Sequence, residues 1–318
     1  MTTMKSTFIK PLAIPLVAML SFSLLLALFE VAVRLIGLGN PLIYRENLLY
    51  GYELIENQKE RRQRGATVTI NHKGLRSTTD WDGKNKILFV GDSVTYGGSY
   101  IDDPEIFSEI ACAKLRAGAH KHAICGNAGT NAYGVRNMLR RIDYGPVQDA
   151  DVVVITVIAG DFLRGMQRLT SLPFFSKRPI GWFRGSKEVV AFLTDTLRSK
   201  LRWQRPHGPS NLLQDQMQEL DMVVQDFKML TDQLKAKGKA VVVVWSPSRN
   251  SVADRPEAVE KLVRERFLAA MAQTTVIDMS NFLRSVTGNV FYDANHLERA
   301  GHAIYGEVLA EVIQPYLK

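Results

Sequence analysis

An apolar segment that ends in a glycine and two polar residues constrains this chain more than any other feature. Residues 87–90 are Ile-Leu-Phe-Val, and Gly91, Asp92 and Ser93 follow directly. Such a run predicts a buried strand, and a serine directly after it is expected at the edge of an open sheet, where α/β folds bind ligands. The segment therefore predicts an α/β fold with Ser93 at the carboxyl edge of its sheet.

A serine at this position acts as a nucleophile only when a base can reach it, and a candidate base lies near the other end of the chain. Asp293 and His296 are three residues apart, so one turn can direct both side chains to the same site. His296 would take the proton from Ser93, and Asp293 would orient the imidazole ring. The alternative is that Ser93 caps a helix and that His296 is a surface histidine.

These two segments resemble the motifs of the SGNH hydrolases, also called GDSL-type esterases. In that family the nucleophile lies in a Gly-Asp-Ser motif early in the domain, and an Asp-x-x-His motif lies near its end. The resemblance covers roughly residues 86 to 318 and is to membrane-tethered bacterial members. It implies a three-layer, doubly wound parallel sheet of the flavodoxin-like SGNH type. It also implies a Ser93–His296–Asp293 catalytic triad with no metal and no cofactor.

The family motifs between these two segments match less closely. Ala132 stands where the family usually has a glycine whose backbone N–H helps to form the oxyanion hole. Gly160, before Asp161, stands where an asparagine usually donates to the oxyanion, and losing one such donor can reduce turnover ~10²–10³-fold. We therefore expect the N–H groups of Ser93 and Ala132 as donors. Asn131 or a residue of the following loop is a candidate substitute for the missing asparagine.

Five residues around these motifs are further candidates for substrate binding: Asp92, Asn131, Gly160, Asp161 and Arg76. Residues 71–76 look like an Asn-x-x-Gly-x-Arg element that tethered members of the family carry before the nucleophile strand. The resemblance would place Arg76 near the rim of the active site, where it would bind a carboxylate or a sugar oxygen. A simple turn around Gly74 is the alternative.

The N-terminal part of the chain is expected to lie outside the soluble fold. The segment from Pro11 to Phe29 carries no charged residue and approaches the ~20 residues needed to span a bilayer. A cleaved signal peptide would need a small-x-small cleavage site, and neither residues 27–30 nor residues 31–33 provide a good one. We therefore predict an uncleaved signal anchor within residues 1–39 that contacts the membrane through residues 11–33.

The orientation of this anchor does not follow from charge, because basic residues lie on both sides of the apolar segment. The resemblance to tethered bacterial members favours a periplasmic or other extracytoplasmic catalytic domain. Export would permit a disulfide between Cys112 and Cys125. From the sequence alone, we favour two buried free thiols, one on a helix and one on a strand.

The rest of the chain alternates between strand-like and helix-like segments, as a doubly wound fold requires. After a membrane-proximal segment at residues 40–85, with a short strand over residues 66–71, the predicted domain runs from residue 86 to 318. Strands are expected near residues 86–90, 122–125, 151–158, 240–245 and 275–278. Asp103 and Pro104 predict a helix start. A long amphipathic helix is expected over residues 211–237, and a C-terminal helix near Leu297 should hold His302 in a structural role.

An insert at about residues 165–208 combines aromatic and basic side chains. It directly follows the third predicted strand and is therefore expected beside the edge of the active site. A lid or an acceptor-binding surface is one interpretation, and contact with an anionic membrane surface is another. The third is an insert that packs for stability and leaves a solvated basic face.

The formal net charge of +8 indicates an anionic partner or surface. Nucleic acid is not expected, because the chain has no zinc-ligand cluster, recognition-helix signature or RNA-binding aromatic motif. Phosphate-loop and dinucleotide-binding fingerprints are also absent from the sequence. The resemblance implies a serine esterase that acts on O-acyl, especially O-acetyl, groups of a cell-envelope polysaccharide or related glycan. An O-acetyltransferase of the same fold, or a non-catalytic module that binds polysaccharide machinery and other envelope proteins, are the alternatives.

Overall fold

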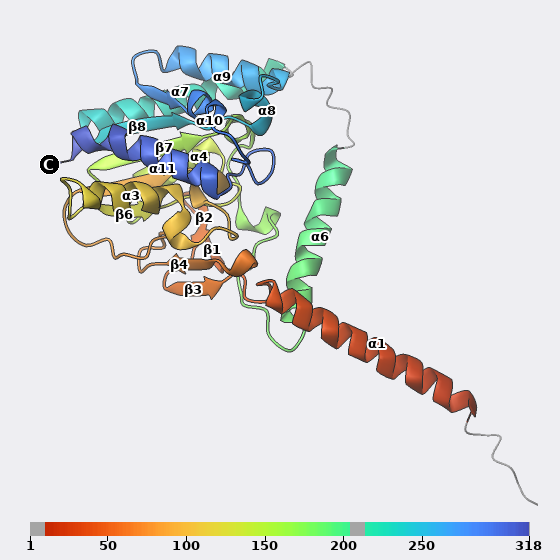
Figure 1. Cartoon of the computed structure of the whole chain (residues 1–318). Coiled ribbons are helices and arrows are strands. Elements are labelled where there is room, and N and C mark those ends of the chain that lie inside the picture. The colour runs from red at the N-terminus through yellow and green to blue at the C-terminus, as the bar shows by residue number, and fades with distance from the viewer. Residues whose placement is uncertain (1–9, 204–213, 318) are drawn as a thin grey trace, which may run out of the picture.

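A five-stranded parallel sheet forms the centre of the chain in a computed structural model that describes residues 10–203 and 214–317 (Figure 1). Its strands are β5 (Lys86–Val90), β6 (Ile124–Asn127), β7 (Val152–Val157), β8 (Ala240–Trp245) and β9 (Val276–Asp278). They lie in the order β6-β5-β7-β8-β9, and each neighbouring pair is parallel. The predicted fold class is confirmed, and all five predicted strands are present within two residues of their expected starts.

The order of the strands places the segment after β5 at the topological switch point of the sheet. From β5 the chain first crosses to β6 on one side and then to β7 on the other. The connections on the two sides of β5 therefore diverge at its carboxyl end, where open α/β sheets bind ligands. Ser93 follows β5 at this position.

Helices cover both faces of the sheet, and the alternation of side chains along the strands explains why (Figure 1). In β7, Val152 and Val154 pack with α3 (Phe107–Ala117) and α11 (Arg299–Ile313). Val153 and Ile155 pack instead with α4 (Val135–Tyr144), α7 (Gln214–Ala236) and α9 (Ala258–Ala270). Because both faces are buried, the strands are continuous apolar runs rather than alternating ones.

Short helices connect these layers: α2 (Ser93–Tyr96), α5 (Ala159–Leu163), α8 (Arg249–Val252) and α10 (Ser280–Arg284). A helix starts at the predicted place, but it is the short 3₁₀ helix Asp103–Glu105 with Asp102 rather than Asp103 as its N-cap, and α3 begins only at Phe107. The carboxylate of Asp103 does not cap a helix, because it accepts a hydrogen bond from the Thr69 N–H at 2.8 Å and pairs with Arg76 at 3.1 Å.

Two antiparallel hairpins form the segment between the N-terminal helix and the sheet. They consist of β1 (Tyr44–Asn47) with β2 (Gly51–Leu54), and of β3 (Gln58–Arg61) with β4 (Thr67–Ile70). The last of these is the short strand expected there. A turn follows, in which Asn71 Oδ1 accepts hydrogen bonds from the N–H groups of Lys73 and Leu75, and Gly74 has a φ of +69°. The turn around Gly74, left open by the sequence, is thus present.

The N-terminal helix α1 (Lys10–Leu35) extends away from the sheet (Figure 1). Within residues Ile14–Leu35 an 18-residue stretch reaches a mean hydropathy of 2.4, and nearly all side chains of this span are exposed. The helix is therefore long and apolar enough to span a membrane.

The insert after β7 contributes α6 (Arg184–Trp203), whose first turn is bound by the C-terminal part of α1. Glu30 accepts hydrogen bonds from the N–H groups of Gly185 at 2.8 Å and Ser186 at 2.9 Å, and Glu188 pairs with Arg62. A carboxylate at the start of a helix satisfies N–H groups that have no partner within the helix. Residues 204–208 of the predicted insert lie outside the described residues.

Cys112 and Cys125 form a disulfide, so the preference for two free thiols was wrong. Cys112 lies on α3 and Cys125 on β6, as expected. Packing of α3 on the sheet brings their Cα atoms to 5.9 Å, which is within the range that a disulfide requires. Sequence spacing alone does not give this distance.

We predict that Cys112→Ala lowers the free energy of unfolding by about 3 kcal/mol, because the disulfide closes a short loop that restricts the unfolded chain. Chemical denaturation of the purified protein without reductant measures this change. Cys125→Ala is the matched control and should lower the free energy of unfolding by the same amount. The double variant should be no less stable than either single variant. Two reactive thiols in the unfolded, unreduced wild type would contradict the disulfide.

We also predict that the protein stays in the membrane fraction after alkaline carbonate washing. Leu20→Arg with Leu24→Arg should release it, because each arginine at the centre of a spanning helix costs about 3 kcal/mol. Immunoblotting of pellet and supernatant provides the measurement. A mature protein that begins beyond Phe29 would instead identify a cleaved signal sequence.

Candidate active site

The nucleophile candidate Ser93 is the first residue of α2, directly after β5 and Gly91. Asp92 caps this helix, since its Oδ1 accepts a hydrogen bond from the Val94 N–H at 2.8 Å. Gly91 is required here: a Cβ atom would lie 2.0 Å from Thr95 Oγ1 and 2.7 Å from the Thr156 carbonyl oxygen. The strand, the tight turn and the cap together fix the position of the serine hydroxyl.

A loop between α10 and α11 brings the candidate base to this hydroxyl. His296 Nε2 lies 2.8 Å from Ser93 Oγ, and His296 Nδ1 lies 2.6 Å from Asp293 Oδ2. The other carboxylate oxygen of Asp293 accepts hydrogen bonds from the N–H groups of Asn295 and His296, both at 2.9 Å. The structure thus brings together the three residues that the paired motifs predicted, although 203 positions separate Ser93 from His296.

The surroundings of Asp293 favour its charged form. Partial burial raises the pKa of this carboxyl, but the hydrogen bonds from the His296 and Asn295 N–H groups and from the imidazole outweigh burial, so the pKa is lower than usual. A carboxylate that remains ionised at neutral pH can orient the imidazole and stabilise its protonated form.

The two backbone N–H groups expected as oxyanion donors are those of Ser93 and Ala132. The Ser93 N–H is in the first turn of α2, where no intrahelical acceptor exists. Ala132 has a φ of +61°, the left-handed region that glycine usually occupies, so alanine keeps the backbone conformation at a cost of roughly 1 kcal/mol. The Thr130 N–H donates to the Gly91 carbonyl at 3.2 Å and ties this loop to the nucleophile turn. Among the described residues, neither donor has an intramolecular acceptor.

Asp92 and Asp161, predicted as substrate-binding residues, lie buried beneath the site. Asp161 Oδ2 accepts a hydrogen bond from the Ile158 N–H at 2.9 Å, and its Oδ1 pairs with Arg164 at the same distance. Asp92 Oδ2 lies 3.2 Å from Arg164 Nη1 and 3.3 Å from Ser93 Oγ. Burial and the charge of Asp92 raise the pKa of Asp161 well above its usual value. Both carboxyl groups are buried and bound by groups of the protein, so they hold the residues around Ser93 in place.

Arg76 does not lie at the rim of the site, and this prediction is corrected. Its side chain is fully buried, and its Nε lies 3.1 Å from Asp103 Oδ1. Its Nη1 donates to the carbonyl oxygens of Tyr96 at 2.8 Å and Gly98 at 2.7 Å. The guanidinium therefore holds the loop after α2 by its backbone. An Asn-x-x-Gly-x-Arg pattern shows that an arginine follows a turn, but not which way it points.

Asn131 is also engaged elsewhere, since its side-chain amide donates to the Tyr44 hydroxyl at 3.1 Å. Its carbonyl oxygen accepts a hydrogen bond from the Tyr52 hydroxyl. These contacts connect the loop before α4 to the first hairpin. They do not support Asn131 as the substitute oxyanion donor.

His302 has the structural position that its helix predicted. Its Nδ1 accepts a hydrogen bond from the Phe107 N–H at 3.2 Å, and its ring stacks on Phe107. Burial and the nearby charge of Arg76 lower the pKa of His302 to about 3, so its imidazole is neutral at physiological pH.

Sequence reasoning missed an aromatic cluster beside the candidate triad. The rings of Tyr100 and Tyr292 stack with centroids 4.0 Å apart, and the Arg64 guanidinium lies over both rings at 5.5 and 5.0 Å. Tyr292 directly precedes Asp293 and is half-exposed. The sequence feature that could have identified this cluster is the position of Tyr292 directly before the Asp-x-x-His motif.

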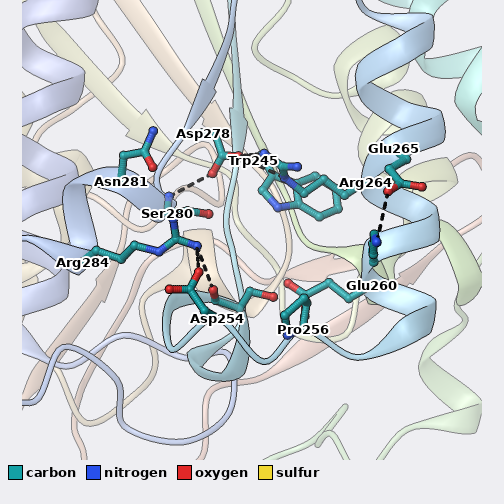
Figure 2. Close-up of a pocket in the computed structure, with 12 residues that line it drawn as sticks. Trp245, Asp254, Pro256, Glu260, Arg264, Glu265, Asp278, Ser280, Asn281 and Arg284 are labelled. Atoms are coloured by element: carbon teal, nitrogen blue, oxygen red, sulfur yellow. Dashed lines mark hydrogen bonds and ion pairs between the residues drawn. The ribbon is translucent and has the colours of Figure 1, made fainter.

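A separate pocket lies at the ends of β8 and β9, between α9 and α10 (Figure 2). Ion pairs line it, including Arg264 with Asp278 and Arg284 with Asp254. None of the three residues of the candidate triad lines this pocket. Its charged groups already have partners within the protein.

Comparison with known proteins gives matches only at the level of structure. No protein-family model and no curated protein matches the chain. A lipase/acylhydrolase from Enterococcus faecalis is 17% identical with a TM-score of 0.47, covering 74% of this chain and 98% of its own. A lipolytic G-D-S-L family protein from Veillonella parvula is 16% identical with a TM-score of 0.43, covering 71% and 97%.

The acetyl xylan esterase AlAXEase is 12% identical with a TM-score of 0.46, covering 72% of this chain and 99% of its own. The similarity of these three proteins to this chain is low, so the function proposed below rests on the geometry of the chain's own site.

We predict that Arg76→Met lowers the free energy of unfolding by about 3–5 kcal/mol, because it leaves Asp103 as a buried charge without its partner. Denaturant unfolding provides the measurement. The matched control is Arg299→Met, which breaks the exposed pair with Glu105 at 2.8 Å and should cost at most ~1 kcal/mol. Equal effects of the two substitutions would show that Arg76 is not the structural anchor described here.

Proposed function

We propose that this protein is a serine esterase of the SGNH type, with Ser93, His296 and Asp293 as its catalytic triad. The observation that carries the proposal is the continuous hydrogen-bonded chain from Ser93 Oγ to His296 at 2.8 Å and from His296 to Asp293 at 2.6 Å. A serine after a buried strand, an imidazole base and an ionised carboxylate are the groups that acyl transfer requires. A surface histidine or a capping serine needs no such arrangement.

In the proposed reaction, Ser93 Oγ attacks the ester carbonyl carbon while His296 Nε2 takes the hydroxyl proton. The Ser93 and Ala132 N–H groups donate to the oxygen on which negative charge develops. Collapse of the tetrahedral intermediate breaks the bond to the alcohol oxygen, which receives the proton from His296. A water molecule, activated by the same imidazole, then hydrolyses the acyl group on Ser93 and restores the enzyme.

O-acyl groups of a cell-envelope glycan are the substrate class that the surroundings of the site support best. Part of both the His296 and Asp293 side chains is exposed, with exposed fractions of 33% and 47%, so a bulky ester can reach them. The Tyr292 ring beside them stacks on Tyr100 and remains half-exposed, so a sugar can contact its open part. The same acyl-serine can pass its acyl group to a sugar hydroxyl, so an O-acetyltransferase uses the same machinery.

An extracytoplasmic location of the catalytic domain is part of this proposal. The helix α1 is apolar enough to hold the protein in a membrane, and the Cys112–Cys125 disulfide is of a kind that persists in oxidising compartments. A glycan of the cell envelope is accessible from that side of the membrane.

We predict that an alkyl fluorophosphonate labels the detergent-solubilised, full-length protein at Ser93, because the reagent requires a serine hydroxyl activated by a base. Peptide mapping by mass spectrometry locates the label. Ser93→Ala should remove it. Ser99→Ala should not, because the Ser99 hydroxyl bonds only to Tyr96, at 3.0 Å, within the described residues. Equal labelling of the Ser93→Ala variant would refute the assignment of the nucleophile, and an unlabelled wild type would favour a non-catalytic module.

A further inference from the structure

The position at which the oxyanion asparagine is missing is occupied in space by another side chain. Gly160 lies in the first turn of α5, directly after β7. A Cβ atom at Gly160 would lie 3.5 Å from Arg164 Nη2 and 3.9 Å from Arg164 Cζ. Residues four apart on a helix are neighbours, so the turn after Gly160 carries Arg164 back over it. The guanidinium therefore fills the space that an asparagine side chain would enter.

The protein holds this guanidinium by one of its terminal nitrogens. Nη1 contacts Asp161 Oδ1 at 2.9 Å, the Tyr133 carbonyl oxygen at 3.1 Å and Asp92 Oδ2 at 3.2 Å. Nη2 has no acceptor among residues 10–203 and 214–317, and a third of the side chain is exposed. Arg164 thus keeps a charged donor free on a group that two buried carboxylates fix in place.

The same contacts connect Arg164 to both of the expected oxyanion donors. Asp92, which it binds, directly precedes the Ser93 N–H, and its Oδ2 lies 3.3 Å from the Ser93 hydroxyl. Tyr133, whose carbonyl oxygen it binds, directly follows Ala132. Arg164 therefore stands between the nucleophile turn and the loop that carries the second donor.

We propose that Arg164 Nη2 is the third oxyanion donor of this site and replaces the asparagine that Gly160 lacks. This inference rests on the proposed esterase function. A charge-assisted hydrogen bond from guanidinium is stronger than one from a neutral amide, and a donor fixed before reaction needs little reorganisation in the transition state. With Arg164 in this role, the glycine at position 160 marks the replacement of an asparagine donor by an arginine donor.

The test is steady-state hydrolysis of an aryl acetate by the full-length protein in detergent, with kcat and KM measured separately. Arg164→Met should lower kcat ~10²–10³-fold with little change in KM, because the donor acts on charge that develops in the transition state. Arg164→Lys keeps a positive charge beside Asp92 and Asp161 but has one nitrogen for all these contacts. It should fold and still lose kcat.

The rescue variant separates a catalytic role from a structural one. Gly160→Asn combined with Arg164→Met should recover at least tenfold of the lost kcat, since it supplies an amide donor at the same place. A side chain fits there, because the Cβ contacts at Gly160 are ordinary ones of 3.5 Å or more. Gly160→Asn alone should give no gain, because Arg164 already fills the position.

Arg136→Met is the matched control, since Arg136 is equally exposed at 33% and also pairs with two carboxylates, Glu219 and Asp226. It should leave kcat unchanged. Folded Arg164 variants with kcat within about twofold of wild type would overturn the inference, as would loss of the fold in both variants. Absence of hydrolysis and of Ser93 labelling in the wild type would instead overturn the proposed function.

Discussion

The buried carboxylate of Asp92 is the group on which the geometry of the candidate site depends. Its Oδ1 caps the helix that begins with Ser93, and its Oδ2 lies within 3.3 Å of both the Ser93 hydroxyl and Arg164. A buried carboxylate is costly unless hydrogen bonds and opposite charge compensate it. Here the compensating groups are parts of the site itself. The cap fixes the serine, and the ion pair fixes the arginine that faces Gly160.

The sequence predicted the fold well because the signals for it are local. Buried strands such as β7 and β8 appear as uninterrupted apolar runs, and each interval between consecutive strands of the sheet is long enough for at least one helix. Ser93, Asp293 and His296 could also be proposed from the sequence, because each lies in a short motif whose place in the fold is fixed by the end of a strand or the start of a helix.

The predictions that failed concern where a side chain points after the chain has folded. Arg76 follows a turn as expected, yet its guanidinium points inward to the backbone of residues 96–101. Cys112 and Cys125 lie on the elements predicted for them, but only the packing of α3 on β6 decides that they meet. Arg164 was missed because it lies one turn beyond the motif, and its importance appears only where it fills the space at Gly160.

The most direct test of the account is whether an acyl group is bound to Ser93 during turnover. The full-length protein would be mixed with an aryl acetate, quenched in acid within the turnover time and digested for mass spectrometry. The account predicts one acetyl group on the peptide that contains Ser93. In Ser93→Ala, both this acetyl group and the hydrolysis should be absent. Hydrolysis that continues at the wild-type rate in Ser93→Ala would contradict it.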